Sequence, residues 1–254
     1  MRHATLALAF LLAACGQQQA EAPAPEEERI IVRVPAPWFI CDSINQPTII
    51  VFNRTNDDVA TAEYGKADGE IVQRIGYFVG ETEGAAGSVM TELVRDEGSD
   101  GSIRQINPGV LANPASAYTL PFASVRLDGR DIQCRWMPRT RVLGFTARRS
   151  FVVHEDADGD LIYTQYNFAD AASARTIELS ENARTTNFSV EIRDGAEQQT
   201  PQATTYTFET QGFRYVVTLN ADGTGALDVS REGASMPTEP TIGYQQGTAQ
   251  ASQQ

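Results

Sequence analysis

Short runs of apolar residues, separated by polar turns, dominate the chain from Ile30 to Ser230. β-Branched and aromatic residues are frequent in these runs, and Gly, Asn, Asp or Pro punctuates most of them. The pattern therefore predicts a mainly β protein with very little helix. The predicted strands are 30–34, 38–41, 48–52, 59–64, 70–79, 88–95, 102–106, 117–122, 124–127, 131–136, 141–154, 160–168, 187–193, 204–210, 213–220 and 225–230.

The segments between these runs carry the residues that tight turns need. Residues 65–69, 155–159 and 221–224 are rich in Asp and Gly, which tolerate a positive φ. Small residues predict a loop at 80–87, and 169–175 is the best helical candidate, at about two turns. Short strands at this spacing predict an antiparallel β-sandwich or barrel-like architecture.

The organisation of the chain is predicted from changes in this pattern. A boundary near 138–144 would divide a first β half (29–137) from a second (138–232), although one continuous sandwich remains an alternative. Beyond 232 the sequence becomes rich in Gln, Ala, Thr and Pro and loses its pattern. Such a composition buries little apolar surface, so we expect residues 233–254 to form a disordered tail.

The N-terminus has the layout of an export signal. Arg2 precedes an apolar stretch of about ten residues, too short for a stable membrane-spanning helix. The Leu-Ala-Ala-Cys sequence ending at Cys15, with Gly16 behind it, resembles the lipobox of bacterial lipoproteins. The alternative is ordinary cleavage at an Ala-x-Ala-like site, with Cys15 incidental.

The resemblance to the lipobox implies that residues 1–14 are a signal peptide and that Cys15 is the lipidated first residue. Its acyl chains would anchor the protein in the membrane, with residues 15–28 as a flexible tether. Because Gly16 is not Asp, the resemblance implies the outer membrane, with the body facing the periplasm or the cell surface.

The charge of the chain limits its partners. The formal net charge is −13, and removal of the signal would make it about −14. This acidity argues against nucleic acid and against direct docking on anionic lipid headgroups. It is compatible with a basic partner protein, and also with solubility alone. Lys66 is the only lysine, and the sequence by itself assigns it no function.

Three cysteines predict one disulfide. If lipid occupies Cys15, only Cys41 and Cys134 remain, and an exported pair usually bonds. Closing so long a loop contributes roughly 4–5 kcal/mol in the chain-entropy model. The alternative is two buried free thiols.

No catalytic, cofactor or metal site is predicted. His154 is the only histidine after signal cleavage, so it is the only candidate for a catalytic triad, and we interpret it as a hairpin-edge residue. The acidic run 155–160 is typical of a hairpin turn. Its spacing also resembles part of a calcium loop, but without the Glu at the twelfth position.

One segment interrupts the acidity. Residues 132–153 contain five arginines and no acid. Arg and Trp dominate interface hot spots, which makes Arg135, Trp136, Arg139 and Arg141 a possible partner surface. The alternative is that the arginines pair with neighbouring acidic strands, while Trp136 packs beside the disulfide.

Together these observations predict a lipid-anchored, non-enzymatic envelope protein that binds or scaffolds another envelope protein. Two alternatives remain. One is a periplasmic inhibitor of a basic hydrolase such as lysozyme, suggested by layout alone. The other is a glycan hydrolase using two carboxylates, among which no motif selects a pair.

Overall fold

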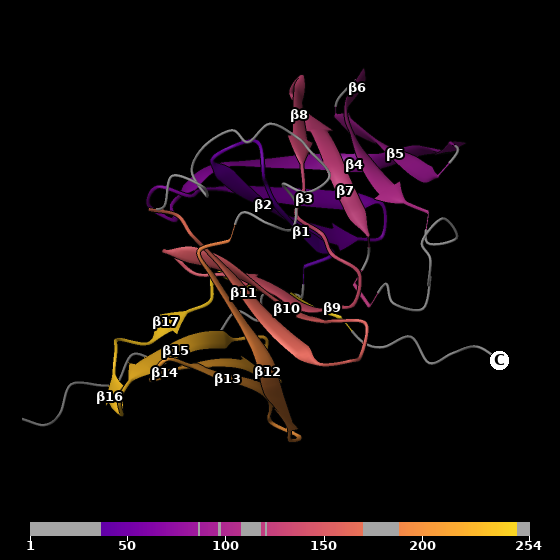
Figure 1. Ribbon diagram of the computed structural model, residues 1–254. Coiled ribbons are helices and arrows are strands. Elements are labelled where there is room, and N and C mark those ends of the chain that lie inside the picture. Colours follow the sequence, from indigo (N-terminus) through magenta and orange to yellow (C-terminus); the bar gives the residue numbers. More distant parts are fainter. Residues whose placement is uncertain are drawn as a thin grey trace, which may run out of the picture. The chain divides into compact units, whose positions relative to one another are not determined.

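The computed structural model describes residues 37–85, 87–95, 98–107, 118–119, 121–169 and 188–247. These residues form two antiparallel β-sheets (Figure 1). Among them there is no helix long and apolar enough to cross a bilayer. The predicted mainly β, barrel-like class is confirmed, because each sheet curls until its first and last strands approach each other.

The first sheet is an eight-stranded meander in which every strand pairs with the next along the chain. A bridge between Ser43 and Cys134 brings its two ends together. The predicted Cys41–Cys134 disulfide is present at the same place. Its strands are β1 (Phe39–Asp42), β2 (Thr48–Thr55), β3 (Asp58–Gly65), β4 (Ile71–Ala85), β5 (Ser88–Arg95), β6 (Gly98–Ile106), β7 (Phe122–Leu127) and β8 (Arg130–Gln133).

The second sheet is also a meander, and C-terminal residues complete it. β18 returns to pair with β9, and β17 pairs with β15. Its strands are β9 (Thr140–Phe145), β10 (Arg149–Glu155), β11 (Leu161–Asn167), β12 (Val190–Gln199), β13 (Ala203–Thr210), β14 (Phe213–Asn220), β15 (Gly225–Arg231), β16 (Ala234–Ser235), β17 (Glu239–Pro240) and β18 (Gly243–Gln246).

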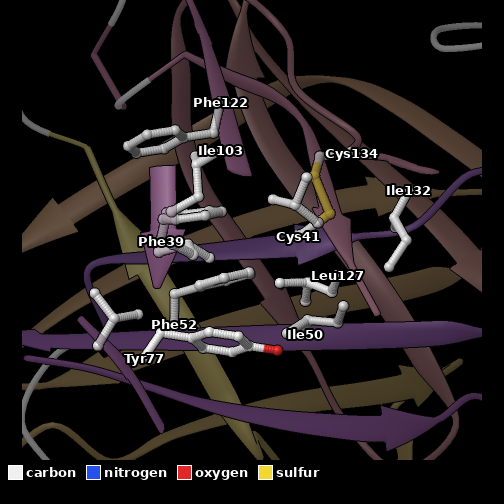
Figure 2. Close-up of a cluster of buried hydrophobic side chains, with 13 residues drawn as sticks. Phe39, Cys41, Ile50, Phe52, Tyr77, Ile103, Phe122, Leu127, Ile132 and Cys134 are labelled. Carbon is white, nitrogen blue, oxygen red and sulfur yellow. A yellow bond between two sulfur atoms is a disulfide. The ribbon is translucent and has the colours of Figure 1, made fainter. Parts of the chain in front are cut away.

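Alternation along the strands produces three apolar cores. One face of the first sheet carries a cluster around Phe39, Phe52 and Leu93, which includes the disulfide (Figure 2). One face of the second sheet carries another, around Tyr163 and Phe208. The opposite faces of β1, β2, β9, β10 and β11 contribute to a third core. The two sheets therefore share buried contacts.

Two strand predictions within the described residues were wrong. The expected loop at 80–87 belongs largely to β4, because Gly80 permits a close approach to β5: a Cβ there would lie 2.6 Å from Glu92 Oε2. The expected single strand 141–154 is divided into β9 and β10. Between them Thr146 Oγ1 accepts the Arg148 N–H at 3.1 Å, a turn signal weaker than Gly or Pro.

The predicted disordered tail was wrong over residues 233–247. Main-chain hydrogen bonds, which composition does not reveal, hold this segment: the Thr241 N–H donates to Gly225 O and the Ile242 N–H to Phe145 O, both at 2.9 Å. Gln245 Oε1 accepts the Ile40 N–H at 3.3 Å. Residues 248–254, the signal, tether and Cys15, the strand 30–34 and most of the helix 169–175 lie outside the described residues.

Candidate functional site

A concave surface lies on the outer face of the first sheet. Leu93, Ile103 and Val125 point into the core, so their neighbours in β5, β6 and β7 point outward. A groove of about 680 Å³ lies on this outer face. It is lined by Glu81, Glu83, Met90, Glu92, Asp100, Gly101, Ser102, Arg126, Asp128 and Gly129.

The acids of the groove differ in how they are paired. Arg95 donates to Asp100 Oδ2 at 3.0 Å and to Asp128 Oδ1 at 3.4 Å. No ion pair within the described residues involves Glu81, Glu83 or Glu92. These three carboxylates therefore give one wall of the groove an uncompensated negative charge.

Apolar side chains lie exposed beside these acids. Phe78 is 59% exposed and Met90 is 41% exposed. Phe78 pairs across the strands with Val94, two residues along β5 from Glu92 and on the same face. Apolar groups rimmed by charge are typical of surfaces that bind proteins.

The residues of the predicted Arg/Trp surface contact other parts of the chain. Arg135 is 3% exposed and donates to Asp42 at 2.8 Å, so it cannot contact a partner directly. Arg141 donates to Glu155 at 2.7 Å, and Arg139 donates to the Asp156 carbonyl oxygen. The part-buried Trp136 donates to Thr119 at 3.2 Å. Intramolecular partners therefore occupy all four side chains.

His154 and the acidic turn after it have structural partners. His154 Nε2 lies 3.3 Å from Thr164 Oγ1, and burial lowers its pKa. Asp156 Oδ1 accepts the N–H groups of Asp158 and Asp160 at 2.9 and 3.0 Å, which fixes the turn. No group of three or more His, Cys, Asp or Glu side chains in the described ranges could hold a metal ion.

A charged pair lies on the core-facing side of the first sheet. Arg130 donates to both carboxylate oxygens of Glu63, at 2.9 and 2.8 Å, and Gln73 donates to Glu63 at 2.8 Å. The hydrogen bonds from Arg130 are the main reason that the pKa of Glu63 lies below its ordinary value.

A second buried polar cluster lies where the two sheets share their core. Asp42 Oδ2 accepts hydrogen bonds from Arg135 Nε at 2.8 Å and from Ser150 Oγ at 2.6 Å. Lys66 Nζ lies 2.6 Å from Asp42 Oδ1 and donates to Ser43 O at 2.6 Å. The guanidinium of Arg135 stacks on the ring of Tyr166, 3.3 Å from its centroid.

This cluster has unusual electrostatics, because one acid faces two bases without contact with water. Burial raises the pKa of Asp42, but the charges of Lys66 and Arg135 outweigh it and lower the pKa to about 2. Burial is also the largest influence on Lys66, whose pKa is lowered despite the attraction of Asp42.

Sequence reasoning missed this cluster because its members come from distant elements. Asp42 ends β1, Lys66 follows β3, Arg135 follows β8 and Ser150 belongs to β10. The available signal was the single lysine of the chain, which carries little meaning until its surroundings are known.

Comparisons with known proteins leave the family open. No family model matches the chain, and no curated protein matches it. One solved structure, the uncharacterized protein lmo1340 from Listeria monocytogenes EGD-e, is similar at 6% identity and a TM-score of 0.21. The similarity covers 78% of this chain and 64% of that protein, so the chain spans less than two thirds of its length.

Proposed function

We propose that this chain is a lipid-anchored protein of the bacterial outer membrane that binds a basic envelope protein and performs no catalysis. Cys15 is the point of lipid attachment. The partner docks in the groove on the outer face of β4 to β7. The observation that carries the proposal is a groove in which three carboxylates have no ion pair within the described residues and Met90 is exposed, with the exposed Phe78 nearby on the same face.

The chemistry of the groove favours a protein over a small ligand. The groove is open and wide, and its charges rim exposed apolar atoms instead of converging on one point. A cationic partner would gain in association rate from the acid wall. Phe78 and Met90 would supply the apolar contact that limits dissociation.

Capture in the native envelope tests the proposal. The lipidated full chain is cross-linked in cells, and its partners are identified by mass spectrometry. We expect Glu83→Lys combined with Glu92→Lys to reduce capture of the partner by at least about tenfold, with a smaller effect at high salt. Glu209→Lys combined with Glu232→Lys makes the same change in net charge outside the groove.

The two charge-reversed pairs separate the possible outcomes. Loss of capture only in the Glu83→Lys/Glu92→Lys variant supports the proposal. Equal loss in both double variants means that net charge alone attracts the partner. Unchanged capture by the Glu83→Lys/Glu92→Lys variant would exclude the groove as the binding site. If the captured protein is a lysozyme whose activity falls on binding, the chain is an inhibitor acting through the same surface.

A further inference from the structure

The single lysine of the chain occupies one of its most buried charged positions. The sequence has 20 lysines and arginines in total, and all except Lys66 are arginine. Lys66 lies directly after β3 and is 3% exposed. An ammonium in such a place loses its contact with water, whereas an exposed arginine keeps it.

The carboxyl group of Asp42 lies against this amine. Asp42 is 0% exposed, and the distance from Lys66 Nζ to Asp42 Oδ1 is 2.6 Å. The amine also donates to the carbonyl oxygen of Ser43 at 2.6 Å, which holds it beside the carboxyl group.

The other carboxyl oxygen is fully engaged. Arg135 Nε and Ser150 Oγ both donate to Oδ2, and both side chains are buried. Two donors aimed at one oxygen polarise the carboxyl group and stabilise negative charge on that oxygen. The stacking of Arg135 on Tyr166 fixes the guanidinium in this position.

We propose that Lys66 and Asp42 become joined by an intramolecular amide bond between Lys66 Nζ and the side-chain carbon Cγ of Asp42. The reacting groups are held in contact, water is excluded, and donors already surround the oxygen that would carry charge. This arrangement meets the requirements of proximity and preorganised electrostatic stabilisation.

The reaction balances with the atoms of the pair alone. A proton passes from the ammonium of Lys66 to Oδ1, which leaves a neutral amine and a carboxylic acid. Nζ attacks Cγ, and charge develops on Oδ2, where Arg135 and Ser150 donate. The bond from Cγ to Oδ1 then breaks. Oδ1 departs as water with the first proton and a second one from Nζ, and no oxidant, reductant or cofactor is consumed.

The amide bond also explains the choice of residue. A guanidinium could form the ion pair with Asp42, but it is a far weaker nucleophile than an amine. The bond would connect the end of β1 to the end of β3, one residue from the Cys41–Cys134 disulfide. After the reaction Arg135 would be the only charged member of the cluster, with the amide oxygen Oδ2 as its acceptor.

Peptide mapping of the lipidated full chain tests the proposal directly. Trypsin cuts an unmodified chain after Arg54, Lys66 and Arg74, which releases peptides 34–54, 55–66 and 67–74. With the amide bond, cleavage after Lys66 is blocked. We expect peptide 34–54 joined to peptide 55–74, lighter than their sum by one water molecule and resistant to reduction. Recovery of 55–66 and 67–74 as linear peptides would overturn the proposal.

Two variants locate the bond. Lys66→Arg keeps the positive charge and Asp42→Ala removes the acceptor, and each should abolish the joined peptide. A parallel digest without reductant reports the Cys41–Cys134 disulfide, and circular dichroism of each variant reports folding. A joined peptide that persists in a folded Lys66→Arg protein would place the cross-link elsewhere and refute the assignment.

Discussion

The two sheets are both meanders, but they are closed by different forces. The first sheet is closed by a β-bridge between Ser43 and Cys134 and by the Cys41–Cys134 disulfide. The second is closed by its own C-terminal segment, which reaches from β15 to β9 through main-chain hydrogen bonds. The first sheet therefore adds to its main-chain hydrogen bonds a covalent closure that needs an oxidising compartment, and the closure of the second is noncovalent.

The interiors of the sheets differ as well. The first sheet holds the Glu63–Arg130 pair on its core-facing side. The core of the second sheet packs the ring of Tyr163 against those of Phe208 and Tyr215, each at a centroid distance of 5.4 Å. An aromatic core does not titrate in the acid range, whereas a carboxylate–guanidinium pair does. We therefore expect redox state to act on the first sheet, and acid to act on it through Glu63. The second sheet also carries part-buried ion pairs, Arg141–Glu155 and Arg149–Glu239.

Loss of the disulfide should have the largest effect. Replacing Cys41 and Cys134 together by alanine should lower the free energy of unfolding by about 4 kcal/mol, because the bond closes a long loop in the unfolded chain. Urea denaturation of the oxidised protein and the double variant measures the difference.

Reductant provides the control for this experiment. Dithiothreitol should destabilise the wild-type protein by a similar amount and leave the double variant unchanged. A double variant within about 1 kcal/mol of wild type would mean that other contacts close the first sheet. The difference between the sheets would then lie in their interiors alone.

Weakening of the C-terminal segment should have the next largest effect. Tyr244 of β18 packs against the core of the second sheet, and its hydroxyl donates to Asn220 O at 3.2 Å. Tyr244→Ala should cost about 2–3 kcal/mol of unfolding free energy, since the side chain is half-buried. Tyr244→Phe removes only the hydrogen bond and should cost about 1 kcal/mol.

Hydrogen exchange shows where this loss acts. In Tyr244→Ala, amides of β9 and β15 should lose protection first, and those of β1 to β3 should keep it. The same loss of protection in both sheets would show that they unfold as one cooperative unit, despite their different closures.

The strands were predictable because local residues determine them. Alternating apolar positions and Asp/Gly turns identified most of the strands, including β5, β13 and β14. The ordered structure of β17 and β18 was not predictable from the sequence, because it depends on main-chain pairing with β15 and β9. Composition reports what a segment can bury, and these residues are held mainly by hydrogen bonds to β9 and β15.

The candidate site was less predictable than the fold. The acidic groove needs the register of β4 to β7, since Glu83, Glu92 and Arg126 come together only on a paired outer face. The arginine-rich segment was visible in the sequence, but burial of Arg135 depends on Asp42, far away along the chain. The acids that pair with these arginines can be identified only when the positions of the strands in the fold are known.

Acid should affect stability less than loss of the disulfide or weakening of the C-terminal segment. The folded-state pKa of Glu63 is lower than its ordinary 4.5, mainly through the hydrogen bonds from Arg130. Ionised Glu63 therefore stabilises the fold above its unfolded pKa, and this contribution is lost as the pH falls through the lower folded value. Glu63→Gln should remove about 1 kcal/mol of stability at neutral pH, because Arg130 is partly exposed.

The pH profile separates this ionic contribution from simple loss of packing. Unfolding free energy measured by urea titration between about pH 6 and pH 3 should fall less steeply in Glu63→Gln than in wild type, so that the two curves converge in acid. Glu209 is an exposed carboxylate of the second sheet, and the Glu209→Gln variant should follow the wild-type profile. Parallel curves for Glu63→Gln and wild type would show that Glu63 acts through its shape, and acid sensitivity would then not distinguish the two sheets.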